Sequence, residues 1–170
     1  LPSYSLARER GYSYVECDVE WTSEGIPVLL HDNTINRTAR NNDGSAIAET
    51  TSINSITLAT AKTYDFGIWK SATYAGTRIP TFDEFIIHCK KNQLHPYIEM
   101  KGTITSQQAE LLVSIVKKYG MIKNCTWISF SFTSLQNISA ATTNERLGYL
   151  VSLSTESITS AITLKDGSNT

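Results

Sequence analysis

The sequence predicts an α/β fold built around a mainly parallel β-sheet, and three observations bear on the architecture of that fold. Strand-like and helix-like segments alternate at short spacing from about residue 81 onward, which is the pattern of β/α units. Acidic residues stand at alternate positions of apolar strand segments. No Gly-x-Gly-x-x-Gly follows any predicted strand, which removes the best argument for a nucleotide-binding open sheet. A β/α barrel and an open doubly wound sheet both satisfy the pattern.

The composition excludes some functional classes. The 170 residues are 41% hydrophobic and carry a formal net charge of -1, which is ordinary for a globular domain. This charge gives no electrostatic argument for binding nucleic acid or an anionic membrane surface. No apolar run approaches the roughly 20 residues of a transmembrane segment. Three scattered cysteines, Cys17, Cys89 and Cys125, lack metal-site spacing and are predicted to be buried free thiols.

The first 32 residues predict the end of a helix and then two strands. Arg10 suits the last turn of that helix, and Gly11 suits the position just past its end. Residues 12–19 and 26–32 are predicted strands joined by a Ser-Glu-Gly turn. Pro27 is tolerable because it stands at the start of its strand, where a missing donor matters least.

Residues 33–80 carry no strong period and are rich in Asn, Thr, Ser and Gly. Such a long irregular segment inside a compact domain is usually a functional lid, an inserted subdomain or disorder. Its tryptophan and tyrosines argue against disorder.

The remaining chain alternates helices and strands. A helix over residues 81–91 is predicted with a Thr81–Glu84 capping box and one apolar stripe, made of Phe82, Phe85, Ile86 and Cys89. A second helix, residues 106–120, is capped by Thr105 or Ser106 and ended by Gly120. Its predicted apolar face is Leu111, Leu112, Ile115 and Val116. The other predicted elements are strands over 95–101, 125–131 and 146–152, a short helix over 134–142 and a possible helix over 155–163.

Two acids stand on one face of the first predicted strand. Side chains alternate along a strand, so Glu16 and Asp18 share a face, and Cys17 and Val19 share the other. Two carboxylates on a buried face, near the strand's carboxyl end, would repel each other and lose hydration. A divalent cation relieves both penalties, and oxygen-only ligands suit Mg²⁺ or Ca²⁺.

The same pattern recurs in the strand over 95–101, where Glu99 and Lys101 alternate with apolar residues. In a β/α barrel, inward residues at the carboxyl ends of different strands meet at one mouth. The acids could therefore hold a metal there, with His31 working beside it. Taken alone, Glu16 with Asp18 is more typical of a solvent-facing strand edge, His31 with Asp32 of a turn that Asp32 caps, and Glu99 with Lys101 of a surface ion pair. The three motifs together favour the functional interpretation. His88 and His95 are expected to be surface or hydrogen-bonded histidines.

At this point the sequence resembles the glycerophosphodiester phosphodiesterase family. Residues 11–44 are similar to that family's signature of a Gly, a strand ending in Glu-x-Asp-Val, a turn Gly, a strand ending in His-Asp, Arg-Thr and a Gly-containing turn. The segments IPTFDEF, YIEMK, SFSFTSL and LGYLV resemble later family motifs. The resemblance runs in order through nearly the whole chain.

The resemblance implies a TIM-type (β/α)8 barrel, incomplete in this chain. Residues 1–170 would be one partial barrel domain, with a small inserted subdomain at about 37–78. The implied activity is metal-dependent hydrolysis of a small-molecule glycerophosphodiester to an alcohol and glycerol phosphate, with one divalent cation, Ca²⁺ or Mg²⁺. The residues carried over by position are the metal ligands Glu16, Asp18 and Glu99, the acid/base residue His31, the phosphate-binding Lys101 and the mainly structural Arg37.

The family pattern also begins with a His-Arg-Gly strand, which carries a second catalytic histidine and has no counterpart here. A full barrel needs about 250 residues, so we expect a trimmed piece with roughly five of the eight strands. Two other functions stay open. One is a catalytically inactive barrel that acts as a binding module, and the other is a Mg²⁺-dependent enolate-forming barrel enzyme. The sequence leaves the head group, the compartment and the oligomeric state open.

Overall fold

A computed structural model describes residues 1–143 and 146–152 of the chain. The strands are β1 (Tyr14–Trp21), β2 (Pro27–Leu29), β3 (His95–Met100), β4 (Thr126–Ser129) and β5 (Leu147–Tyr149). The helices are α1 (Pro2–Glu9), α2 (Leu58–Ala61), α3 (Phe82–Asn92), α4 (Ser106–Lys118) and α5 (Phe132–Ala141). Short 3-10 turns are η1 (Ile53–Ser55), η2 (Ala72–Tyr74) and η3 (Ile122–Asn124). The helix predicted over 155–163 lies outside the described residues.

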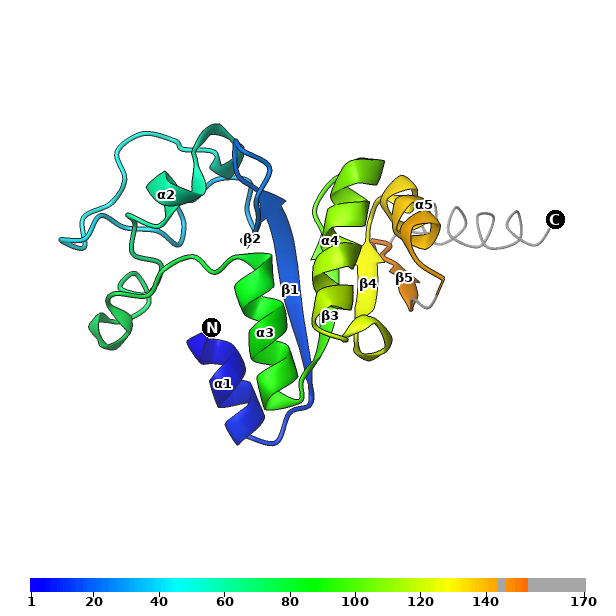
Figure 1. The fold of residues 1–170 in the computed structure, drawn as a ribbon. Helices are drawn as coiled ribbons and strands as arrows, with labels where there is room; N and C mark the ends of the chain where they lie inside the picture. Colours follow the sequence, from blue (N-terminus) through cyan, green and yellow to red (C-terminus); the bar gives the residue numbers. More distant parts are fainter. Residues whose placement is uncertain (144–145, 153–170) are drawn as a thin grey trace.

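The strands form one sheet in the order β2-β1-β3-β4-β5 (Figure 1). The pairs β1–β3, β3–β4 and β4–β5 are parallel, as predicted, whereas β2 pairs antiparallel with β1. All five predicted strands are present in this sheet, which agrees with the expected count of roughly five. Four of the described strands run in a common direction, and β2 runs the opposite way. Within the described residues β2 and β5 are separate edges, so the sheet is open.

The second strand is shorter than the predicted range of 26–32. It ends at Leu29, although the amide of Leu30 still donates to the carbonyl of Asp18 at 3.1 Å. His31 and Asp32 therefore follow the strand instead of ending it. Because the chain leaves the ladder there, their side chains are free of the strict alternation that a longer strand would impose.

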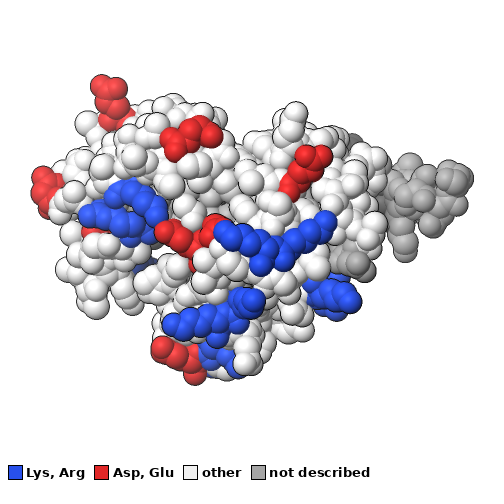
Figure 2. All heavy atoms as spheres, viewed as in Figure 1, with Lys and Arg blue, Asp and Glu red and all other residues white. Residues whose placement is uncertain are grey.

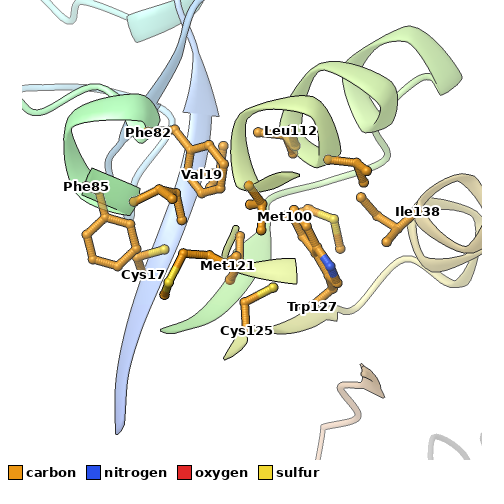
Figure 3. Close-up of a cluster of buried hydrophobic side chains, with 14 of the residues drawn as sticks. Cys17, Val19, Phe82, Phe85, Met100, Leu112, Met121, Cys125, Trp127 and Ile138 are labelled. Carbon is orange, nitrogen blue, oxygen red and sulfur yellow. The ribbon is translucent and has the colours of Figure 1, made fainter. Parts of the chain in front are cut away.

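The main hydrophobic core lies between one face of the sheet and the helices. Alternate strand residues such as Cys17, Val19, Met100 and Trp127 are buried in one cluster with side chains of α3, α4 and α5 (Figure 3). The predicted stripe of α3 is fully buried, and its Thr81–Glu84 capping box is formed. The three cysteines are buried free thiols, as predicted.

The buried face of α4 differs from the prediction. The helix buries Ala109, Leu112, Val113 and Val116, whereas Leu111 is 39% exposed. Positions 109, 112, 113 and 116 follow the i, i+3, i+4, i+7 spacing of a single stripe. The predicted face was chosen from the largest aliphatic side chains, and it was therefore rotated about the helix axis toward Leu111. Thr105, one of the two proposed caps, accepts the amide of Gln108.

The opposite face of the sheet is open. Glu16 is exposed there and Asp18 and Glu99 are partly buried, so the expectation that the acids stand on a buried face is wrong for the described residues. The physical reason is that four parallel strands and a hairpin partner do not close over their own inner face. The side chains of Tyr14, His95 and Tyr97 contact one another on this face.

Residues 33–80 fold as a loop-rich segment with a second hydrophobic cluster. Its fully buried members include Val28, Ile35, Ile53 and Ile79. The carboxylate of Asp65 accepts the backbone N–H groups of Gly67 and Ile68 at 2.7 and 2.9 Å, and also that of Gly76. This ordered core agrees with the argument against disorder, and the subdomain bounds of about 37–78 stay a prediction.

The described surface adds two observations. Lys and Arg side chains lie among Asp and Glu side chains on the face drawn in Figure 2, without a broad field of one sign. Among the described residues, none of the helices combines the length and apolar character that a bilayer crossing needs.

Candidate functional site

The three predicted acids converge where the middle of β1 lies beside the carboxyl end of β3. These strands pair in parallel with Asp18 opposite Glu99, and both side chains point away from the main core. Glu16 precedes Asp18 by two residues and therefore shares its face. One carboxylate oxygen from each acid lies within 4.8 Å of the others. The β1–β3 register therefore assembles the cluster from two distant parts of the sequence.

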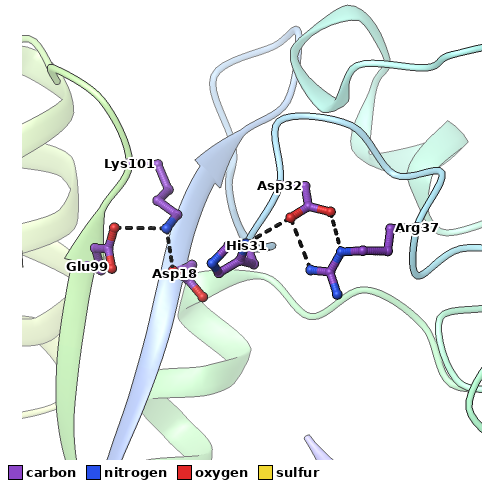
Figure 4. Close-up of polar contacts among 6 residues, drawn as sticks. All are labelled: Asp18, His31, Asp32, Arg37, Glu99 and Lys101. Atoms are coloured by element: carbon purple, nitrogen blue, oxygen red, sulfur yellow. Dashed lines mark hydrogen bonds and ion pairs between the residues drawn. The ribbon is translucent and has the colours of Figure 1, made fainter. Parts of the chain in front are cut away.

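Lys101 bridges two of these acids. Its backbone N–H donates to the carbonyl of Val19 at 3.3 Å, which holds the residue just past β3. Its ammonium Nζ lies 2.9 Å from Asp18 Oδ1 and 2.9 Å from Glu99 Oε1 (Figure 4). The three side chains are each at most 20% exposed. Hydrogen bonds to Glu99 and Asp18 outweigh desolvation and raise the pKa of Lys101, so it stays charged.

Glu16 is the least compensated member of the cluster. Desolvation, followed by repulsion from Asp18 and Glu99, raises the pKa of Glu16 to about 7, and Lys101 and His31 only partly oppose these effects. Three carboxylates face one ammonium, so the fully ionised cluster carries an excess of two negative charges. The raised pKa of Glu16 is the physical expression of this excess.

These residues fit a hard divalent cation. All three acids offer oxygen donors, which Ca²⁺ and Mg²⁺ prefer over nitrogen or sulfur. A charge of +2 matches the excess negative charge of the ionised cluster. Such a cation would also favour the ionised form of Glu16, whose pKa is otherwise raised toward neutrality.

His31 lies beside the acidic cluster and is the first of three polar side chains in contact, His31, Asp32 and Arg37. The hydrogen bond between Leu30 and Asp18 anchors the residue before it. The side chain of His31 is 65% exposed, and its Nδ1 lies 2.8 Å from Asp32 Oδ1. His31 is close enough to Glu16 for its charge to lower the pKa of that carboxyl.

Arg37 binds Asp32 on the side away from His31. Its Nε and Nη2 donate to the two carboxylate oxygens of Asp32 at 2.5 and 3.0 Å (Figure 4). Hydrogen bonds from Arg37 and then from His31 lower the pKa of Asp32 to about 2. Sequence reasoning assigned Asp32 at most a turn-capping role and missed this link to His31. The sequence holds no clear signal of this link, because residues 32–37 lie outside the helices and strands, where spacing does not predict contacts.

The other two histidines lie elsewhere, as expected. His88, on α3, is 3.4 Å from the hydroxyl of Ser5, and His95 is 2.9 Å from the hydroxyl of Thr126. His95 begins β3, whereas Glu99 and Lys101 lie at the other end of that strand. Of the three histidines in the chain, His31 is therefore the one at the acidic cluster.

Parallel strands with helices on one face, and carboxylates side by side on neighbouring strands, are typical of α/β proteins of the β/α-barrel type. The particular family follows from comparison with known proteins. The chain belongs to the glycerophosphoryl diester phosphodiesterase family, because the model of that family matches residues 1–165. The resemblance seen in the sequence motifs is thereby confirmed.

The chain is 28% identical over 152 residues to a glycerophosphodiester phosphodiesterase from Caldanaerobacter subterraneus subsp. tengcongensis. That match covers 88% of this chain and 59% of the relative, so the chain spans little more than half of the relative's length. A glycerophosphodiester phosphodiesterase from Agrobacterium tumefaciens has a similar fold, with a TM-score of 0.73 and 23% identity over 86% of this chain and 58% of its own.

A third similar protein is an Oleispira antarctica phosphodiesterase, whose structure contains the product sn-glycerol-3-phosphate. It has a TM-score of 0.74 and 23% identity, and the match covers 96% of this chain and 65% of the other. These neighbours are TIM-type barrels, which confirms the predicted fold class. The open sheet described above corresponds to part of such a barrel. Membership in this family favours neither of the two other functions left open by the sequence, the inactive binding module and the Mg²⁺-dependent enolate-forming enzyme.

Proposed function

We propose that the protein hydrolyses glycerophosphodiesters to an alcohol and glycerol phosphate, with one divalent cation, Ca²⁺ or Mg²⁺, held by Glu16, Asp18 and Glu99. One observation carries the proposal. This chain belongs to the phosphodiesterase family, and one oxygen from each of its three carboxylates lies within 4.8 Å of the others. The ammonium of Lys101 contacts two of these carboxylates, Asp18 and Glu99. The glycerol phosphate product in the Oleispira antarctica structure supports the choice of substrate class.

The side chains divide the chemistry between charge and proton transfer. Lys101, with its raised pKa, supplies a fixed positive charge for the non-bridging oxygens of the phosphodiester. Glu16, Asp18 and Glu99 would hold the cation, which would offset negative charge on the phosphate and lower the pKa of the attacking oxygen. With the three acids neutralised in this way, the ammonium of Lys101 would be available to the substrate.

His31 is the proposed acid/base residue. Its Nδ1 is engaged by Asp32, so Nε2 is the nitrogen that exchanges a proton with the reacting oxygens. In the hydrolysis, the oxygen of water forms a new P–O bond and the water gives up a proton, while the P–O bond to the head-group alcohol breaks and the leaving alcohol takes up a proton. With its side chain 65% exposed, His31 is open to solvent and to a substrate.

The direct test is release of glycerol phosphate from glycerophosphocholine by the purified parent protein that contains this chain, with Ca²⁺ or Mg²⁺ and with a chelator. We expect cation-dependent release, and a loss of at least about 100-fold in kcat for His31→Asn, since general acid/base catalysis contributes a factor of this order. Glu99→Gln should lose both activity and cation binding. His88→Asn is the matched control and should keep full activity.

Near-normal turnover of a folded His31→Asn variant would contradict the role of His31. A folded protein that binds the cation and releases no glycerol phosphate from any glycerophosphodiester would contradict the hydrolase assignment and favour the binding module.

A further inference from the structure

We infer that Asp32 and Arg37 act as a positioning pair that keeps the proton of neutral His31 on Nδ1 and leaves Nε2 as its basic nitrogen. This inference rests on the proposed function for its catalytic meaning, whereas the arrangement of the ring can be measured independently. In the view of Figure 4 the imidazole of His31 lies between the carboxylates of Asp18 and Asp32. The hydrogen bond on one side of the ring therefore decides which nitrogen is available on the other side.

The first step concerns the partner of Nδ1. A carboxylate that is ionised can only accept hydrogen bonds. Asp32 Oδ1 lies 2.8 Å from His31 Nδ1, so the proton of this hydrogen bond belongs to the ring. Neutral His31 is thereby held as the Nδ1-protonated tautomer, with a lone pair on Nε2. A general base needs this lone pair at the nitrogen that faces the reaction.

The second step concerns what holds Asp32. Arg37 binds both of its oxygens with a planar guanidinium, which fixes the direction of the carboxylate as well as its charge. The hydrogen bonds from Arg37 and His31 lower the pKa of Asp32, so the carboxylate is ionised throughout the neutral range. Arg37 thus acts on the ring through Asp32 and has no need to touch the substrate.

The exposure of the pair argues against a purely structural role. The side chain of Arg37 is 56% exposed and that of Asp32 is 27% exposed. Solvent-exposed ion pairs of this kind add little to folding stability. The contact has a clearer consequence for the imidazole, because removing the acceptor at Nδ1 would let the two neutral tautomers exchange freely.

The tautomer can be measured by the ¹⁵N chemical shifts of the imidazole ring. The sample is the purified, cation-free protein at a pH above the pKa range of histidine. The resonances of His31 are assigned by their loss in His31→Gln, and His88 is the internal control. The parent protein should show a protonated Nδ1 and an unprotonated Nε2. Asp32→Asn should give a mixed or inverted pattern, and Arg37→Lys, which keeps a cation beside Asp32, should retain most of the parent pattern.

Catalytic consequences are tested separately. Asp32→Asn should lower kcat at least tenfold and change KM and the cation dissociation constant less than threefold. An Nε2-protonated His31 in the parent, or an unchanged ring pattern in folded Asp32→Asn, would overturn the inference even if the protein proves inactive. A lowered Tm in Asp32→Asn with unchanged ring shifts and unchanged kcat would assign the pair a structural role only. Conversely, absence of glycerophosphodiester hydrolysis with the expected ring pattern would refute the proposed function and leave the positioning pair intact.

Discussion

Asp18 and Glu99 stand opposite each other in the parallel β1–β3 pair, and one ammonium lies 2.9 Å from an oxygen of each. Lys101 therefore acts as the counter-cation of two acids that would otherwise repel each other across the pair. Adding a divalent cation to the same cluster changes this balance, which makes Lys101 the most informative residue for experiments on the site.

Lys101→Met should destabilise the cation-free protein and increase its response to cations. Loss of the ammonium leaves two partly buried carboxylates unpaired, which should cost about 1–2 kcal/mol for a site with this exposure, below the value for a fully buried pair. The corresponding decrease in Tm is roughly 2–8 °C for a domain of this size. Adding Ca²⁺ or Mg²⁺ should raise the Tm of the variant more than that of the parent, because no ammonium competes for the acids. Equal cation-induced shifts in both proteins would contradict this account.

Removing one acid should weaken cation binding. Asp18→Asn deletes a charge from the cluster, and we expect the dissociation constant for Ca²⁺ or Mg²⁺ to rise at least about tenfold, since affinity follows the number of charged ligands. Isothermal titration calorimetry measures this directly. Glu20→Gln is the matched control, because Glu20 lies on the same strand and outside the group of three acids. Similar losses in the two variants would mean that overall charge, and not the cluster, determines binding.

The raised pKa of Glu16 predicts a specific pH dependence of stability. Its value is about 7 in the folded protein, against an ordinary value of 4.5. Between these two pH values the unfolded chain releases the proton and the folded chain keeps it, so the free energy of unfolding falls as pH rises. In a chelator, the stability of Glu16→Gln relative to the parent should therefore increase from pH 4.5 to 7 and then level off. Denaturant unfolding curves that differ by a constant amount across this range would contradict the assignment.

The stability of the segment between β2 and α3 should depend on the carboxylate of Asp65. Burial would raise the pKa of its carboxyl, but backbone N–H donors from Gly76, Ile68 and Gly67 lower it overall. Asp65→Ala leaves these donors, of which the amide of Gly67 is buried, without their acceptor, which should cost about 1–3 kcal/mol. Hydrogen exchange at the three amides should accelerate before the rest of the protein. Asp43→Ala, in an exposed turn, is the control and should change stability much less.

Much of the sheet and one part of the site follow from local patterns in the sequence. Alternating residues in the segments of β1 and β3 predict which side chains face the helices, and Thr81 with Glu84 predicts the start of α3. These features depend on contacts between residues close in sequence. The meeting of Glu16 and Asp18 with Glu99 needed the further assumption of a β/α barrel with parallel strands, which the alternation of strands and helices suggested and the family resemblance strengthened.

Other features depend on tertiary context and could not be predicted. The rotation of α4 is set by the shape of the surface on which Ala109 packs, and small residues carry little weight in an apolar pattern. The early end of β2 reflects the turn into residues 33–80, and the open inner face depends on how many strands are present. Nothing in the local pattern shows that Arg37 folds back onto Asp32.

The parallel pairing of Asp18 with Glu99 joins positions that are 81 residues apart in the chain. Closing so long a loop carries an entropic penalty that is offset only when β1 and β3 dock, and contacts of high sequence separation form slowly. The proposed cation site is therefore absent from any intermediate in which these two strands are still apart. In a refolding experiment, the recovery of cation binding would report the moment at which the two halves of the polypeptide join.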